Sequence, residues 1–454
     1  MSEGRFGSLA DDIRELMEET GVPGVAVGVQ HDGEEQTAGF GVTSVENPLP
    51  VTDETLFQIG SITKTYTALI ILHLVEEGKL GLDAPVRDYL PEFRVQDKMA
   101  TTGVTLRHLL THTAGWVGDF FVDTGAGDDA AGKYVAAMAD LEQLAPLGTR
   151  YSYNNAGFYL AGAIIEAVTG KSYRQVLREL VLEPLQLHHT FLDPGDVMTH
   201  RFVVGHEIDD EAGAQVARPW ALARALYPVG GLVCDVQDLL RYARFQLGDG
   251  ATAAGERLLR PETLSLMHTA QVTAAADRES VGLAWHIRTT DELRLISHGG
   301  GTKGQISLLL FVPEHHFALA LLTNGSRGGR ITQEVQRRAL ETFLGVALPE
   351  PQPVEASAET LLAYAGTYSR PFADVELRME NGQLVAYVTY KEGFPAREVP
   401  PAPAPPPMAV APCGDERLLV LDGPWQDTQM EIIRRPDGTI GWLRTSRLHR
   451  RVDG

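Results

Sequence analysis

Ser61 and Lys64 lie three residues apart at the start of a strongly apolar stretch. Apolar residues recur from Ile62 to Val75 with no Pro or Gly before Gly78, which predicts a buried helix that ends at this glycine. One helical turn places the lysine ammonium beside the serine hydroxyl. Because a lysine with a depressed pKa can take the hydroxyl proton, the pair predicts nucleophilic catalysis. The alternative is a serine N-cap followed by a solvated lysine.

Two further sets of polar residues follow in the sequence. Tyr153-Asn154-Asn155 directly precedes a predicted helix over 156–169, which Gly170 ends. His298-Gly299-Gly300-Gly301 separates two predicted strands. Neither set identifies a reaction by itself. The indication of function comes from the order in which both sets follow the serine and lysine.

The elements that must position these residues are predicted from periodicity and turn residues. An amphipathic helix over 10–20 precedes strands over 25–30 and 36–42, which the hairpin turn Asp32-Gly33 joins. His112 is expected to be a structural hydrogen-bonding residue. In chain order, the remaining predictions are a capped helix at 105–116, a Gly/Asp-rich segment at 117–133 that can roof a pocket, a helix with Asp235 as its N-cap, strands at 282–286, 293–297, 305–311 and 318–323, and a helix at 334–344.

Composition excludes several classes of protein. The 454-residue chain has a formal net charge of -21, which argues against nucleic acid or an anionic membrane as a partner. The first residues show no apolar signal-peptide region and no run is long enough for a membrane span, so a cytoplasmic location is expected. Two cysteines are too few for a disulfide scaffold or a zinc site.

A proline-rich segment over 348–358 is predicted to link two domains, at 1–347 and 359–454. The second alternates short strands such as 375–379 with turns such as Asn381-Gly382. This pattern predicts a small antiparallel barrel or sandwich, lipocalin-like in type. No catalytic set of residues is apparent in this C-terminal domain.

Taken together, the three motifs resemble those of the serine penicillin-recognising superfamily, which includes class C β-lactamases, DD-peptidases, esterases and D-aminopeptidases. Its members carry Ser-x-x-Lys, Tyr-x-Asn and then Lys-Thr-Gly or His-x-Gly in this order. The resemblance covers about residues 10–345. It implies an α/β (α+β) transpeptidase-like domain with an antiparallel sheet flanked by helices.

The resemblance also implies roles for individual residues. Lys64 and Tyr153 would form the proton relay that activates Ser61, and either could be the base. Tyr153 is chosen over Tyr151 because only Tyr153 has Asn at the third position of its motif. Backbone N–H groups of Ser61 and Gly301 would form the oxyanion hole.

The remaining motif residues would bind the substrate. Asn155 would hold a substrate amide and help to orient Lys64. His298 and Gly300 belong to the third motif, where histidine replaces the lysine of class C β-lactamases. This histidine is commoner among esterase and peptidase-like relatives, and it is a weaker anchor for a carboxylate than an ammonium is. No metal or organic cofactor is implied.

The predicted reaction is hydrolysis of a peptide or amide, D-residues included, or of a small ester. β-Lactamase or carboxypeptidase activity is the alternative, and a non-catalytic binding protein on the same fold is the second. An α/β-hydrolase is disfavoured because no serine after Gly301 stands in Gly-x-Ser-x-Gly. The C-terminal domain either restricts access to the cleft or mediates assembly of a homo-oligomer.

Overall fold

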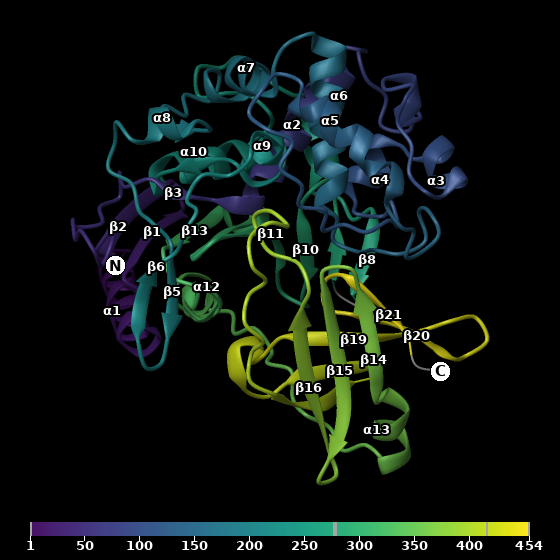
Figure 1. Cartoon of the computed structure of the whole chain (residues 1–454). Helices are drawn as coiled ribbons and strands as arrows, with labels where there is room; N and C mark the ends of the chain where they lie inside the picture. Colours follow the sequence, from purple (N-terminus) through teal and green to yellow (C-terminus); the bar gives the residue numbers. More distant parts are fainter. Residues whose placement is uncertain (1, 276–278, 415, 453–454) are drawn as a thin grey trace.

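A computed structural model describes residues 2–275, 279–414 and 416–452. We call residues 2–344 the N-terminal part, and the closed structure of strands β14–β21 the barrel. In Figure 1 the barrel, coloured green to yellow, lies below most of the helices. Residues 345–357 contain no helix or strand, and the domain boundary at 348–358 stays a prediction. Among the described helices, none is long and apolar enough to cross a membrane.

An eight-stranded antiparallel sheet organises the N-terminal part, in the order β2-β1-β13-β12-β11-β10-β9-β8. Alternate side chains point to opposite faces of a strand, so both faces of the central strands are apolar. Helices cover both faces, which confirms the predicted fold class. The strands are β1 (Gly24–His31), β2 (Glu34–Gly41), β8 (Val272–Ala275), β9 (Glu279–Val281), β10 (His286–Thr289), β11 (Arg294–Thr302), β12 (Gln305–Val312) and β13 (Phe317–Thr323).

The faces of this sheet have different partners. In β13, Leu319 and Leu321 pack toward α1 (Ser2–Thr20) and α12 (Gly328–Ala339). The alternate residues Ala320 and Leu322 belong to the large core on the other face. That core contains the central helices α2 (Thr63–Glu76), α6 (Asn155–Thr169) and α10 (Val236–Leu247).

The central helix matches its prediction closely. A single 3-10 turn, Gly60–Ile62, leads into α2, in which every residue from Thr63 to Leu72 is buried. The helix ends before Gly78, which adopts a φ of +71°. Glycine enters this left-handed region without steric cost, which explains why the helix stops there.

Three predicted helices have different bounds in the structure. The N-terminal helix begins at Ser2, well before residue 10. The helix predicted over 105–116 is only α4 (Leu106–Leu110), because His112 has a φ of +56° that no α-helix accommodates. The helix predicted at 334–344 begins earlier, as α12, and continues as a π-helical turn over Leu340–Leu344.

One predicted strand is a turn. The apolar residues 282–285 connect β9 to β10, and Ala284 there has a φ of +66°. Leu283 and Trp285 are fully buried, so these residues are apolar because they pack in the core. The Ala284 N–H donates to Leu110 O at 2.9 Å, outside any sheet.

The C-terminal strands close into an eight-stranded antiparallel barrel, which decides between the predicted barrel and sandwich. Buried side chains such as Tyr368, Leu384 and Leu443 occupy its interior. The helix α13 (Ala358–Tyr364) precedes the barrel and was not predicted. The strands are β14 (Gly366–Arg370), β15 (Ala373–Glu380), β16 (Gln383–Tyr390), β17 (Met408–Gly414), β18 (Arg417–Val420), β19 (Gln429–Arg434), β20 (Ile440–Arg444) and β21 (Leu448–Arg451).

The barrel contacts the N-terminal part through the turn that joins β20 to β21. Ser446 in this turn has a φ of +77°, and its carbonyl accepts a hydrogen bond of 2.9 Å from the Tyr153 N–H. The Leu448 N–H donates to Ser152 Oγ at 3.1 Å. These bonds place the turn directly beside the second sequence motif.

Candidate active site

Ser61 and Lys64 are in hydrogen-bond contact at the start of α2. Lys64 Nζ lies 2.9 Å from Ser61 Oγ and 2.8 Å from Val229 O. The lysine side chain is fully buried. Its burial rules out a solvated lysine, and the N-caps at this end of the helix are isoleucines rather than Ser61.

The surroundings of Lys64 favour its neutral form. Burial is the main cause that lowers the pKa of Lys64 well below its usual value, and the positive charge of Arg447 lowers this pKa further. Asp119 opposes both effects. A neutral amine can accept a proton from the serine hydroxyl, whereas an ammonium cannot.

Tyr153 lies over the same lysine. The centre of its ring is 5.1 Å from Lys64 Nζ, and its hydroxyl is buried next to the Ser61 side chain. Burial raises the pKa of Tyr153, and the neighbouring Ser61 side chain opposes the rise. Tyr151 is buried as well, and its ring faces His112 and His286. The geometry therefore brings Tyr153 to the serine and lysine.

The residues after Tyr153 hold the loop in place. Asn154 is the N-cap of α6, since its Oδ1 accepts from the Gly157 N–H at 2.8 Å. The Asn154 N–H donates to His112 Nδ1 at 2.9 Å, and the His112 ring stacks on Tyr153 at 4.4 Å. These contacts agree with the structural role predicted for His112.

The third motif lies within a strand, where a connection between strands was predicted. His298, Gly300 and Gly301 belong to β11 and pair with residues of β12. A Cβ at Gly300 would lie 1.9 Å from Ile59 O, and a Cβ at Gly60 would lie 2.6 Å from Gly301 N. Glycine at both positions thus lets β11 pass directly against the turn that carries the serine.

His298 is buried and neutral. Burial, His286 and Lys64 all lower the pKa of His298 well below its usual value. Its Nδ1 lies 2.5 Å from Gly299 O, and Nε2 has no partner among residues that the structure describes. An uncharged imidazole offers hydrogen bonding to a substrate but no charge for a carboxylate.

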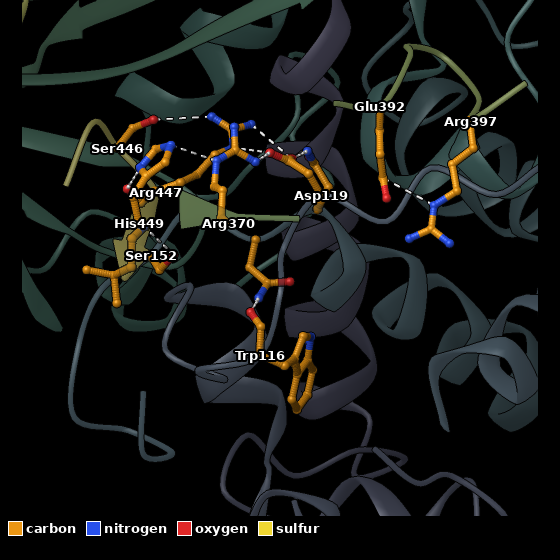
Figure 2. Close-up of polar contacts among 12 residues, drawn as sticks. Trp116, Asp119, Ser152, Arg370, Glu392, Arg397, Ser446, Arg447 and His449 are labelled. Atoms are coloured by element: carbon orange, nitrogen blue, oxygen red, sulfur yellow. Dashed lines mark hydrogen bonds and ion pairs between the residues drawn. The ribbon is translucent and has the colours of Figure 1, made fainter. Parts of the chain in front are cut away.

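Asn155 contacts a residue that the sequence did not indicate. Its Nδ2 donates to Asp119 Oδ1 at 2.7 Å. Asp119 also forms ion pairs with Arg370 Nη1 and Arg447 Nε of the barrel, both at 2.6 Å (Figure 2). The barrel therefore brings two charged side chains to this site, although no catalytic set of residues was apparent in its sequence. Lys64 contacts Ser61 and Val229, and none of its described hydrogen bonds is to Asn155.

A cleft of about 660 Å³ connects these residues with the barrel. Six of the residues that the sequence predicted for the site line this cleft, and the seventh, Lys64, is buried next to Ser61. Aromatic residues from the barrel and the loop after α4 form another side of the cleft: Phe121, Phe372, Tyr390, Phe394 and Trp425. The six predicted residues are Ser61, Tyr153, Asn155, His298, Gly300 and Gly301. A second cavity, of about 520 Å³, shares only Leu222 with this cleft and holds none of these six.

Known proteins resemble this chain in sequence and in fold. Residues 9–342 match the model of the family described as beta-lactamase. Penicillin-binding protein 4 from Amycolatopsis lactamdurans is 35% identical over 363 residues, covering 78% of this chain and 95% of the relative.

Two solved structures extend the likeness to the barrel. The structure of SurE with D-Leu is 25% identical and covers 99% of this chain and 100% of its own, with a TM-score of 0.75. The octameric penicillin-binding protein homologue from Pyrococcus abyssi is 25% identical and covers 98% and 99%, with a TM-score of 0.68. With a family match over most of its length and a serine beside a buried lysine, this chain belongs to the β-lactamase family of serine hydrolases.

Proposed function

We propose that the protein cleaves a peptide or amide bond, or a small ester, through an acyl-enzyme on Ser61. The observation that carries this proposal is the contact of 2.9 Å between Ser61 Oγ and the fully buried Lys64 Nζ at the floor of an open cleft. Burial keeps the amine in its basic form, which is the form that the reaction needs.

The first step forms the acyl-enzyme. Lys64, with the Tyr153 hydroxyl beside it, takes the proton of Ser61 as Oγ attacks the substrate carbonyl carbon. The N–H groups of Ser61 and Gly301 stabilise the negative oxygen, at about 3 kcal/mol for each donor. The proton then passes to the leaving amine or alcohol as its bond to the carbonyl carbon breaks.

The second step releases the acyl group. Water attacks the ester carbonyl while the same lysine and tyrosine remove its proton, and Ser61 Oγ leaves with a proton. In this reaction Asn155 and His298 contact the substrate, since both line the cleft together with Ser61.

The cleft favours a peptide with apolar side chains. Its aromatic residues are half-buried or buried, and Phe121 packs edge-on against Phe372 and Phe394 at 5.7 and 5.0 Å. Binding of D-Leu by SurE supports acceptance of a D-residue. The neutral His298 argues against a β-lactam as the physiological substrate, because the lactam carboxylate would lack a cationic partner there.

Covalent labelling tests the proposal. A fluorophosphonate probe is expected to add its mass to the peptide that contains Ser61, and S61A should neither be labelled nor turn over substrate. S265A changes a serine outside the cleft and should behave as the wild type does. A panel of nitrophenyl esters, D- and L-amino-acid anilides and nitrocefin then ranks the substrates. Absence of labelling on Ser61 with no turnover of any ester or anilide would refute the proposal.

We also infer a homo-oligomeric state in the cytoplasm. The octameric Pyrococcus relative spans nearly the whole chain and supports self-association. Light scattering at micromolar concentration would give the mass, and a monomer would contradict the inference. Fractionation of the source cells tests the location.

A further inference from the structure

Asp119 lies buried between the two parts of the molecule, on the loop between α4 and α5 (Ala130–Ala137). Its side chain is only 3% exposed. One oxygen accepts from Asn155 Nδ2 at 2.7 Å, and the other forms ion pairs with Arg370 and Arg447 at 2.6 Å. Figure 2 shows both arginine side chains converging on this carboxylate. A single residue thus connects the second sequence motif with the barrel.

The two arginines keep Asp119 ionised. Burial acts to raise the pKa of Asp119, but Arg447 and Arg370 outweigh it and hold this pKa below its usual value. A buried carboxylate without such partners would be strongly destabilising. The barrel therefore supplies the charge that allows a carboxylate to exist beside Asn155.

An ionised carboxylate restricts the side chain of Asn155. A carboxylate only accepts hydrogen bonds, so the nitrogen of the Asn155 amide must face Asp119 and the oxygen must face away. A neutral partner with both a donor and an acceptor would not impose this choice. The orientation of the Asn155 amide in the cleft follows from the charge of its neighbour.

We propose that Asp119 is a positioning residue that holds the Asn155 amide in one orientation for the acyl transfer on Ser61. The inference rests on the proposed function, because it assigns Asp119 to that reaction. Asp119 acts through Asn155, and the docked barrel arginines fix the carboxylate that does so. No step of the reaction requires a proton on Asp119.

The variant D119N tests the proposal with almost no change in shape. Its amide can pair with Asn155 in either orientation, so the fixed orientation is lost. With a nitrophenyl ester that the wild type hydrolyses, kcat should fall by roughly 10- to 100-fold, while KM changes by less than about threefold. E142Q is the matched control, because it breaks the 2.7 Å ion pair of Glu142 with Arg450 between the same two parts, outside the cleft.

A double-mutant cycle separates positioning from general stabilisation. In the N155A background, D119N should cost less than about twofold in kcat, because its target is already absent. A merely structural role would give the same loss in both backgrounds. If D119N fails to fold, R370M tests the same link more mildly, since Arg447 still pairs with the carboxylate. It should cost a few-fold in kcat, again only when Asn155 is present.

The outcomes distinguish this inference from the proposed function. A wild-type protein that neither labels on Ser61 nor turns over an ester refutes the function. If the wild type is active and D119N has the same kcat, the positioning role alone is refuted. The same holds if D119N lowers kcat equally with Asn155 present and in the N155A background. The positioning role is supported if D119N lowers kcat only in the protein that retains Asn155, and if the kcat of E142Q stays within about twofold of the wild type.

Discussion

The guanidinium carbon of Arg447 lies 4.8 Å from the centre of the Tyr153 ring, on the side of the cleft formed by the barrel. A cation over an aromatic face is attracted by the ring, and this arginine is also paired with Asp119. Its positive charge is the second cause of the lowered pKa of Lys64, after burial. The barrel therefore acts on Lys64, the proposed base, through its positive charge, and it also shapes the cleft.

Removal of this charge should displace the pH dependence of the reaction. In R447M the pKa of Lys64 should rise, so a larger fraction of the lysine is protonated at a given pH. The ascending limb of kcat/KM should move to higher pH, with a loss of about tenfold at pH 6 and a smaller loss at pH 9. A pH profile of kcat/KM with a nitrophenyl ester measures the ascending and the descending limb. The other charged or titratable groups around this lysine are Asp119, His112, His298 and Tyr153.

R450M is the matched control for this profile. Arg450 lies in the same barrel and pairs with Glu142 on the surface. Its loss should leave both limbs where they are in the wild type. If R447M lowers kcat/KM equally at every pH, the charge acts on binding or folding and the electrostatic role is wrong.

The serine and lysine could be found from the sequence because one helical turn fixes their relation. Two side chains that are three residues apart in a helical segment lie on the same face, and this holds for any arrangement of the rest of the fold. The helix N-cap at Asp235 was predictable for the same reason, and its side chain accepts from the Asp238 N–H. Local geometry carried these predictions.

The contribution of the barrel could not be found in this way. Arg370 and Arg447 belong to no motif and reach the cleft because the barrel packs against the loops that carry Asp119 and Tyr153. Asp119 lies in a segment with several similar residues and no periodic pattern. Tertiary packing of two parts far apart in the chain decided these positions, and a single sequence carries no local signal for it.

The three consecutive glycines of β11 differ in the space that is available for a Cβ atom. Alanine at two of these positions should therefore have very different effects. In G300A the new Cβ would lie 1.9 Å from Ile59 O, so the strand must move away from the serine turn. The resulting displacement of the Gly301 N–H should lower kcat/KM by about 100-fold or more. Overpacking should also destabilise the protein by roughly 1–3 kcal/mol.

G299A provides the comparison on the neighbouring residue. A Cβ there would meet only Ser307 O, at the ordinary contact distance of 3.6 Å. Its kcat/KM should stay within about threefold of the wild type. Steady-state kinetics with melting curves measure both effects, and equal losses in the two variants would show that the close approach of β11 to the serine turn is not required.

His268 should make the fold less stable in mild acid. The side chain is buried, its Nε2 lies 2.9 Å from Gln246 Oε1, and burial lowers the pKa of His268 to about 3. In the unfolded chain a histidine has a pKa of about 6.5, so between these values the unfolded chain binds more protons. The stability that neutral His268 preserves is therefore complete above about pH 6.5 and is lost as the pH falls toward 3.

The variant H268Q removes this titration and keeps a polar group near Gln246. Between pH 7 and pH 5 the wild type should lose about 2 kcal/mol more than H268Q does. Urea unfolding followed by tryptophan fluorescence measures the difference, since the buried Trp285 ring is 6.0 Å from His268. H315Q changes an exposed histidine and should show the same loss as the wild type. Because other buried histidines titrate in both proteins, only a difference in slope between the wild type and H268Q reports on this residue, and equal slopes would mean that His268 is not held neutral by its burial.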